Sequence, residues 1–209
     1  MNSERIIQPM DIEKKSFEII ESHISDIFIP DDRKDIVKRV IHTTADFDYV
    51  DNLKFSDDSI SSALKALKEG ATIVTDTNMA YSGINKTALA KIGGKAVCFM
   101  SDSDVAEEAK KREITRAAVS MEKACSVSGN LIFAIGNAPT ALLELDRLIR
   151  EGKVNPSLII GVPVGFVNVC ESKEIIMESG VPYIVAKGRK GGSNVAAAIC
   201  NALIYKLYR

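Results

Sequence analysis

Five short apolar runs alternate with helix-like segments along most of the chain. The runs are rich in valine, isoleucine and phenylalanine and cover residues 71–75, 95–100, 131–135, 157–162 and 182–186. The segments between them place apolar residues at helical spacing. Such alternation is typical of βαβ units, in which helices cover both faces of a mainly parallel sheet. The sequence therefore predicts a three-layer, doubly wound α/β fold with a mainly parallel, five-stranded sheet.

Two more helices are expected before this alternating region. Residues 11–24 carry apolar side chains at helical spacing, and Ser16 lies among them. Residues 33–42 form the second predicted helix, after a turn whose carboxylates suit a helix N-terminus. Its last turn carries Arg39 and His42. Its apolar face is formed by Ile36, Val37, Val40 and Ile41.

The charge balance excludes two classes of protein. The 209 residues include 27 Lys and Arg against 28 Asp and Glu, which gives a formal net charge of −1. A chain without a net basic field is a poor candidate for binding nucleic acid or an anionic membrane. Because the sequence has no internal repeat and no linker-like stretch, we expect one domain over residues 1–209.

The cysteines and the N-terminus indicate a reducing compartment and no metal centre. The four cysteines lie far apart, without a histidine at metal-ligand spacing, so we expect buried free thiols. They are Cys98, Cys125, Cys170 and Cys200. The N-terminus lacks the apolar stretch of a signal peptide, and no window approaches the ~20 apolar residues of a membrane span. We expect a cytoplasmic protein.

Polar or glycine-rich segments follow four of the five predicted strands. They are residues 76–79, 136–140, 161–165 and 187–193. In doubly wound sheets, ligands bind in the crevice beyond the carboxyl ends of the strands. We therefore expect a ligand site where these segments meet.

Arg39 and His42 are the first candidate for chemistry. At a spacing of three residues on a helix, their side chains share a face. Histidine is the side chain type whose unperturbed pKa lies near neutrality, so His42 could donate or accept a proton. The alternative is a histidine that only complements the helix macrodipole. The Arg39 cation favours a neutral imidazole, whereas a carboxylate bound to Arg39 would favour the imidazolium.

The second candidate is the helix start at residues 136–140. Asn137 is a preferred capping residue and Pro139 suits the first helical position, so helix capping alone explains the segment. The functional alternative is that free backbone N–H groups hold a carboxylate or phosphate of a ligand. Both interpretations remain open from the sequence.

The third candidate is the stretch KGRKGGSN at residues 187–194. Its glycines let the backbone approach a ligand, while Lys187, Arg189 and Lys190 concentrate positive charge before a helix N-terminus. The spacing matches neither a phosphate loop nor a dinucleotide fingerprint. With further cations in REITR (112–116) and at Lys86, these loops would form a rim for an anionic ligand. The alternative is a solvated basic turn.

Six stretches, spread over nearly the whole chain, form a specific combination of motifs. They are RVIHTTADFDY (39–49), TDTNMAYSGI (75–84), TRAAV (115–119), AIGNAPTALLEL (134–145), LIIGVPVGFVNVCESKE (158–174) and KGRKGGSNVAAAICNAL (187–203). In this order they closely resemble the precorrin-8X methylmutase family of cobalamin biosynthesis. The resemblance implies a homodimeric isomerase with a Rossmann-like fold. It would move a methyl group from ring carbon 11 to ring carbon 12 of precorrin-8X or its cobalt complex, giving hydrogenobyrinate or cobyrinate.

The resemblance also assigns residues. It implies that His42 is catalytic, as proton donor or acceptor, and that Ser16, Arg39 and Arg116 contact the substrate. Together with the loops described above, Asn137, Lys187 and Arg189 complete the expected binding residues for a tetrapyrrole polycarboxylate. No cofactor and no protein-bound metal are expected, because any cobalt arrives inside the substrate. Residues 168–170 (NVC) depart from the small pair common in the family, which affects pocket shape and not the chemistry.

Two functions of other classes remain as alternatives. A non-catalytic tetrapyrrole carrier would bind the same ligand, but it would have no use for a proton donor at His42. A nucleotide-dependent α/β enzyme is disfavoured by the missing phosphate-binding motifs.

Overall fold

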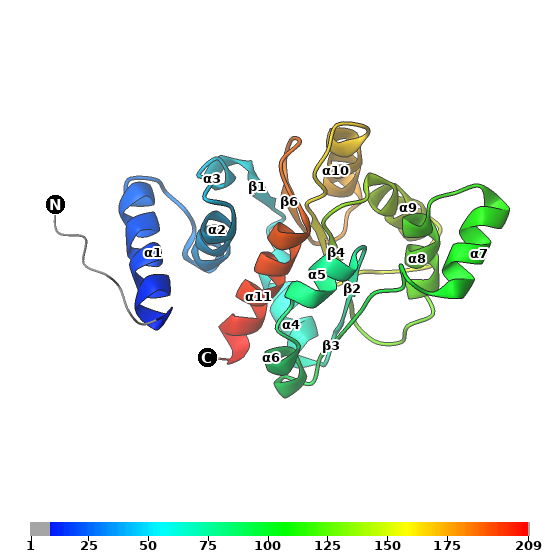
Figure 1. Ribbon diagram of the computed structural model, residues 1–209, viewed down its shortest axis with the longest axis horizontal. Helices are drawn as coiled ribbons and strands as arrows, with labels where there is room; N and C mark the ends of the chain where they lie inside the picture. Colours follow the sequence, from blue (N-terminus) through cyan, green and yellow to red (C-terminus); the bar gives the residue numbers. More distant parts are fainter. Residues whose placement is uncertain (1–8, 209) are drawn as a thin grey trace.

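The structure is a computed structural model that describes residues 9–208, with side chains from residue 11. In this part of the chain, eleven helices surround one six-stranded sheet (Figure 1). The helices are α1 (Pro9–Ile24), α2 (Asp31–Thr44), α3 (Tyr49–Asn52), α4 (Ser59–Lys68), α5 (Asn78–Gly83), α6 (Lys86–Lys91), α7 (Ser103–Arg112), α8 (Arg116–Ala124), α9 (Pro139–Arg150), α10 (Val169–Glu178) and α11 (Ser193–Tyr208). The strands are β1 (Leu53–Phe55), β2 (Thr72–Thr75), β3 (Lys95–Val97), β4 (Leu131–Ile135), β5 (Leu158–Gly161) and β6 (Tyr183–Ala186).

The strand order is β1-β6-β5-β4-β2-β3. All five predicted strands are present and pair in parallel. The predicted number of strands is wrong, because β1 adds an antiparallel sixth strand at the edge, with Leu53 opposite Ala186. With only three residues, β1 has no apolar run that a sequence pattern could detect. From β2 the chain passes to β3 on one side and then to β4 on the other, so the strand order reverses between β2 and β4.

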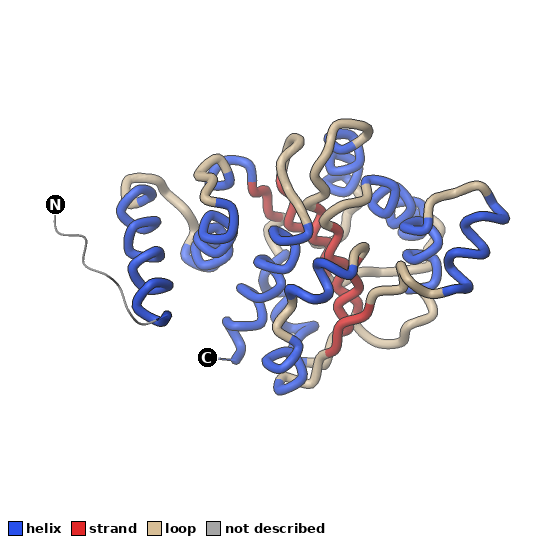
Figure 2. The backbone as a smooth tube through the Cα atoms, viewed as in Figure 1, coloured by secondary structure: helices blue, strands red, loops and turns tan. Residues whose placement is uncertain are grey.

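Helices cover both faces of the sheet (Figure 2). Successive residues of β4 alternate between two hydrophobic clusters, as the pleat requires. Ile132 and Ala134 pack in the cluster that includes residues of α2, α4 and α11. Phe133 and Ile135 pack in the cluster that includes residues of α8, α9 and α10. Because both faces are covered, the strands are apolar on both sides, which is the pattern that made them predictable.

The two predicted N-terminal helices are also present as α1 and α2. The buried face of α2 consists of the four predicted residues, Ile36, Val37, Val40 and Ile41. Figure 1 shows α1 at the end of the molecule, beyond α2 and away from the sheet. Among the described helices, none combines the length and the apolar character that crossing a membrane requires.

Candidate functional site

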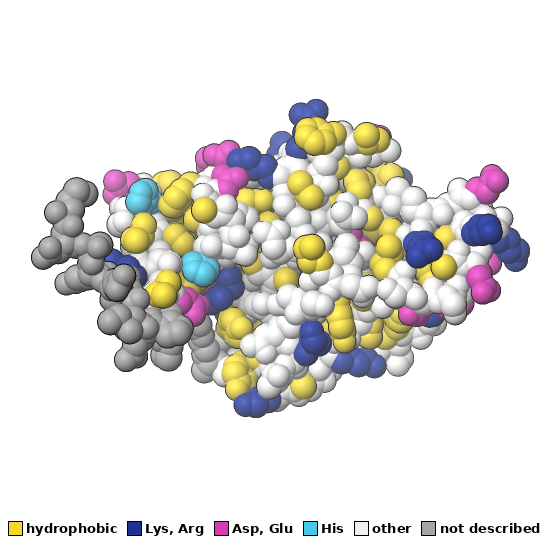
Figure 3. Space-filling model, in the orientation of Figure 1, with side chains coloured by type: hydrophobic (Ala, Val, Ile, Leu, Met, Phe, Trp, Pro, Cys, Tyr) yellow, Lys and Arg dark blue, Asp and Glu magenta, His cyan; other side chains and the backbone are white. Residues whose placement is uncertain are grey.

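The last turns of α2 bring Arg39 and His42 to the same aromatic ring. The imidazole of His42 stacks on the Phe17 ring of α1, with centroids 5.0 Å apart and an angle of 16° between the planes. The guanidinium of Arg39 lies 5.4 Å from the centre of the same ring. The prediction that the two side chains share a helix face is therefore confirmed. His42 is exposed at the surface, where Figure 3 shows both histidines of the chain at the same end of the molecule.

Arg39 lies in a groove between α1, α2 and α11. Its guanidinium lies between the rings of Phe17 and Tyr205, 4.9 Å from the centre of the latter, and its Nη2 is 3.6 Å from Glu13 Oε1. The groove has a volume of about 850 Å³, within the range of small-molecule sites. Its lining consists of Glu13, Lys14, Phe17, Glu18, Glu21, Ser22, Ser25, Asp35, Lys38, Arg39, Ala202, Tyr205 and Lys206.

Two other cations of the groove have closer carboxylate partners than Arg39. Lys38 Nζ lies 2.8 Å from Glu21 Oε2, and Lys206 Nζ lies 3.1 Å from Asp35 Oδ2. Arg39 is thus the most loosely paired of the three. A ligand carboxylate can displace Glu13 from Arg39 at a lower cost than it can displace the other two partners.

Ser16 occupies a less direct position. It is half-buried on α1, and its hydroxyl donates a hydrogen bond to the Ile12 carbonyl oxygen at 2.8 Å. Ser16 does not line the groove, although its neighbour Phe17 does. Its contact with substrate remains a prediction.

Beyond His42, the chain contacts the segment before α11. Lys190 Nζ lies 2.6 Å from a carboxylate oxygen of Asp46 and 2.6 Å from one of Asp48. The ammonium group lowers the pKa of Asp46. A hollow of about 360 Å³ lies here, lined by Thr43, Thr44, Asp46, Tyr49, Val164, Lys190, Gly191 and Asn194. His42 itself is not among the residues that line either hollow, but its stacking partner Phe17 lines the groove and its neighbour Thr43 lines the smaller hollow.

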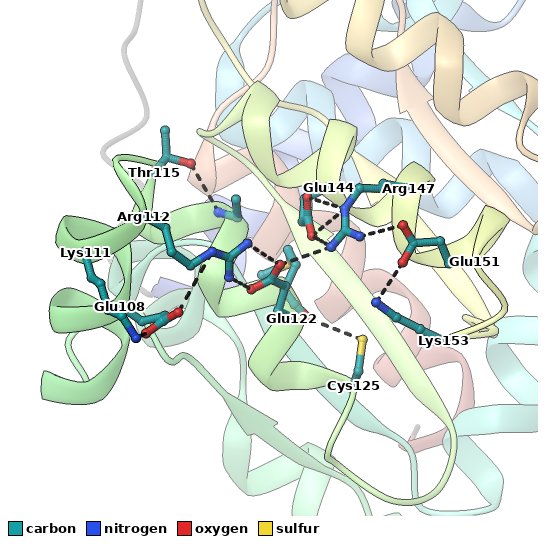
Figure 4. A network of polar contacts seen from close by, with 12 residues as sticks. Glu108, Lys111, Arg112, Thr115, Glu122, Cys125, Glu144, Arg147, Glu151 and Lys153 are labelled. Atoms are coloured by element: carbon teal, nitrogen blue, oxygen red, sulfur yellow. Dashed lines mark hydrogen bonds and ion pairs between the residues drawn. The ribbon is translucent and has the colours of Figure 1, made fainter.

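The predicted cationic rim is smaller than the sequence suggested. The charge of Lys190 is neutralised by Asp46 and Asp48. Lys86, on α6, donates a hydrogen bond to the carbonyl oxygen of Tyr81, on α5, at 2.9 Å. Arg112 belongs to a surface network in which Glu122 also contacts Arg147 (Figure 4). Each of these three cations is already engaged by protein groups, which a ligand would have to displace, and the expectation that they face the ligand stays a prediction.

Three other predicted cations stay accessible. Lys187, Arg189 and Arg116 are exposed, and within residues 11–208 none of them forms an ion pair. Lys187 and Arg189 lie on the segment that Lys190 ties to the end of α2. Arg116 begins α8, whose capping residue Thr115 bonds to Thr140 at the start of α9. Figure 1 shows α8 and α2 on opposite sides of the sheet, so the helix that Arg116 begins lies across the sheet from the helix that carries His42.

Three backbone N–H groups of the segment at residues 136–140 are not free. The backbone N–H groups of Gly136, Asn137 and Ala138 donate to the Asp76 carboxylate at 2.9, 2.8 and 2.7 Å. The ligand-binding interpretation of these groups is therefore wrong: a carboxylate of the protein occupies them. Asn137 is not the cap either, because the N-cap is Ala138; Pro139 at the first helical position is confirmed. Burial raises the pKa of Asp76, against the effect of the three hydrogen bonds.

Comparison with known proteins identifies the family. A family model described as precorrin-8X methylmutase matches residues 11–206. The chain belongs to the precorrin-8X methylmutase family. It is therefore a methylmutase, an isomerase that shifts a methyl group in cobalamin biosynthesis.

Relatives of this methylmutase match it over nearly their whole length. The cobalt-precorrin-8 methylmutase of Salmonella typhimurium is 48% identical over 209 residues, which cover 97% of both chains. That of Priestia megaterium is 48% identical, covering 94% of this chain and 88% of its own. The precorrin-8X methylmutase of Pseudomonas aeruginosa is 38% identical, covering 92% and 93%. A crystal structure of the Thermus thermophilus precorrin-8X methyl mutase has a TM-score of 0.85 at 38% identity, covering 93% and 96%.

Sequence reasoning about the methylmutase site missed Asp76 and Lys173 as buried charged groups. Asp76 directly follows an apolar run, so the sequence places it at the carboxyl end of a strand. The sequence does not indicate which groups bind its side chain. Lys173 is four residues after Val169 and three before Ile176, both buried on α10, so helical spacing already placed it on the inward face. Burial lowers the pKa of Lys173 to about 8.

The described part of this methylmutase contains no cluster of three or more His, Cys, Asp or Glu side chains that could hold a metal ion. All four cysteines are free thiols, as expected, but of these only Cys200 is fully buried.

Proposed function

We propose that this chain moves the methyl group on ring carbon 11 of precorrin-8X, or of its cobalt complex, to ring carbon 12, with His42 as the proton donor. The product is hydrogenobyrinate or cobyrinate. The observation that carries the proposal is the position of His42: its imidazole is exposed and shares the Phe17 ring, which lines the groove, with the loosely paired Arg39. The cobalt complex is the favoured substrate, because the more similar relatives carry its name.

The proton accounts for the chemistry of the shift. Moving a methyl group between adjacent ring carbons rearranges the conjugated system. Protonation of a ring nitrogen or carbon draws electrons in the direction that the migration requires. Because substrate and product are isomers, the substrate must give up one proton for the one that it receives. His42 therefore acts first as an acid and then as a base.

Arg39 offers the substrate an anchor next to His42. Its guanidinium lies close to the ring on which His42 stacks, and its Nη2 is 3.6 Å from Glu13 Oε1. A carboxylate of the substrate can take the place of Glu13 on Arg39. We propose that Arg39, Lys187 and Arg189 bind carboxylates near His42. Arg116, Asn137 and Ser16 would contact other parts of the macrocycle.

Replacement of the two histidines tests the assignment. His42→Ala is expected to lower turnover by about 10²- to 10⁴-fold, the usual contribution of a positioned acid or base, while the folded variant still binds product. His23→Ala is the matched control, because His23 is also exposed and stacks on a phenylalanine, Phe47, at 5.0 Å. It is expected to retain wild-type turnover. A folded His42→Ala protein with wild-type turnover would remove the histidine from the mechanism.

Three further parts of the proposal rest on the family resemblance and the topology. We propose a Rossmann-like, doubly wound arrangement of three layers, supported by the reversal of strand order and by helices on both faces. We propose a homodimer, supported by large apolar side chains at the surface such as Phe28 and Phe166, which are 91% and 86% exposed. Light scattering on the purified protein measures the oligomeric state. The proposed reaction needs no cofactor, since cobalt enters within the substrate.

A further inference from the structure

Lys173 carries a buried positive charge that the reaction described above does not use. Its side chain is 0% exposed on the inward face of α10. Its ammonium donates hydrogen bonds to the carbonyl oxygens of Gly188, at 2.7 Å, and Lys190, at 2.9 Å. Within residues 11–208, no carboxylate forms an ion pair with it. A charge that is buried without a counter-ion destabilises the fold, so the ammonium serves a purpose other than packing.

Both of these carbonyl groups belong to residues 187–192, which we name the basic loop. The carbonyl between them, that of Arg189, accepts a hydrogen bond from Gly165 N at 3.2 Å. Three consecutive carbonyl groups of the basic loop, those of residues 188–190, therefore accept hydrogen bonds from Lys173 and Gly165. Gly188 adopts φ +83°, a conformation that side chains rarely tolerate. Meanwhile the side chains of Lys187 and Arg189 stay exposed.

The basic loop also contacts the segment that follows His42. The side chain of Lys190 bridges Asp46 and Asp48, which follow α2. Gly191 packs so closely on the Val162 carbonyl group that a Cβ atom would overlap it. Thus Lys173 holds the backbone of the basic loop, and Lys190 adds exposed ion pairs to the segment that follows His42.

We propose that Lys173 is a positioning residue for the methylmutase reaction: its ammonium holds the basic loop in the shape that presents Lys187 and Arg189 to the carboxylates of the substrate. Lys173 does not touch the substrate. Its charge has the same sign as those of Lys187 and Arg189, so it also adds to the positive potential that attracts a polyanion. This inference rests on the proposed function, because it requires the substrate to bind beside His42.

A double-mutant cycle between Lys173 and Arg189 tests the proposal. Lys173→Met keeps the side-chain volume and removes the ammonium, and Arg189→Ala removes an exposed cation of the basic loop. Each is expected to raise KM about tenfold, with kcat within about threefold of wild type. Because both act through the same loop, the double variant is expected to raise KM about tenfold and not a hundredfold. Lys153→Met is the control, since Lys153 is an exposed lysine paired with Glu151; its KM is expected to match wild type.

Hydrogen exchange provides a readout of the loop itself. In folded Lys173→Met, the amides of residues 187–192 are expected to exchange faster, while those of α9 keep their wild-type rates. If Lys173→Met fails to fold, Lys173→Gln takes its place in the cycle. Glutamine keeps an N–H donor without the charge, so its KM is expected to lie between wild type and the Met variant.

Four outcomes would overturn the proposal. They are a wild-type KM in folded Lys173 variants, a hundredfold additive effect in the double variant, unchanged exchange in residues 187–192, and a wild-type KM for Arg189→Ala. Turnover of the wild type and its loss in His42→Ala are measured in the same assay. Failure of the proposed function is thereby distinguished from failure of this inference.

Discussion

The carboxyl edge of the sheet differs between two of its parts. Where β2 and β4 lie side by side, the Asp76 carboxylate accepts hydrogen bonds from three backbone N–H groups at the start of α9. Near β6, the end of α2 and the basic loop expose His42, Lys187 and Arg189. The first part is closed by a carboxylate of the protein, whereas the second leaves an imidazole and two cations accessible.

This difference shows why strand order alone does not locate the site. Open α/β sheets bind ligands where the strand order reverses, which in this chain is between β2 and β4. Asp76 already occupies the anion-binding helix start at that point. Gly136 also packs against Ser193 so tightly that a Cβ atom would approach the Ser193 Cα to 2.6 Å. The reversal point is therefore part of the scaffold, and the candidate site lies at the α2 end of the same edge.

The largest effect is expected from removal of the Asp76 carboxylate at the start of α9. Asp76→Ala leaves three backbone N–H groups without their acceptor, and each unpaired group costs about 1 kcal/mol or more. We expect the free energy of unfolding, measured by urea denaturation, to fall by about 3 kcal/mol. Asp104→Ala removes an exposed carboxylate that is paired with Lys123 and should leave the unfolding midpoint nearly unchanged. Equal midpoints for the two variants would show that Asp76 is not a structural anion.

The next largest effect concerns the buried ammonium of Lys173, which bonds to the basic loop. Lys173 has a folded pKa of about 8, below its ordinary value of 10.5. Between these values the unfolded chain binds the proton that the folded protein has released, so stability rises with pH. The free energy of unfolding of wild type minus that of Lys173→Met should therefore increase by about 2 kcal/mol from pH 8 to pH 10. Subtraction cancels the titrations that both proteins share, and parallel curves would contradict the buried ammonium.

A smaller effect is expected in the groove next to His42. Arg39→Ala removes the loosely paired guanidinium, and we expect KM to rise about tenfold while kcat stays within about threefold. Lys206→Ala alters a cation of the same groove that is held by Asp35, so its KM should equal that of wild type. Steady-state kinetics of both variants measure the difference. The same KM for both would exclude Arg39 from substrate binding.

The smallest effect is expected from the side chain of Lys190 on the basic loop. Lys190→Met removes an exposed ammonium that Asp46 and Asp48 already neutralise. Exposed ion pairs contribute little to stability, and the bonds from Lys173 still hold the loop backbone. We expect the thermal unfolding midpoint to change little and KM to stay within about threefold. A tenfold rise in KM would mean that Lys190 contacts the substrate directly.

The sequence predicted those features of the fold that depend on local pattern. The five parallel strands were predictable because each is an apolar run with helices on either side, and α2 was predictable from the spacing of its buried residues. By contrast, β1 has three residues and forms only through pairing with β6, more than a hundred residues later. No local pattern contains that information.

The candidate site was also predictable only where it depends on local spacing in the sequence. Arg39 and His42 are three residues apart, so helix geometry placed them together. The partner of the N–H groups at residues 136–138 is Asp76, 60 residues earlier in the chain. The carboxylates that neutralise Lys190 lie 142 and 144 residues before it. The sequence therefore indicated where charges are, but not which of them the fold neutralises.

Hydrogen exchange of the wild-type protein, with and without saturating cobyrinate, tests the central claim most directly. If the substrate site lies at the α2 end of the carboxyl edge, bound product should slow exchange in residues 42–48 and 187–192. The backbone amides of residues 136–138, which Asp76 already holds, should exchange at the same rate in both samples, because the proposed contact of Asn137 with the macrocycle is made by its side chain. Slower exchange confined to residues 136–138, with no change in residues 42–48, would contradict the account.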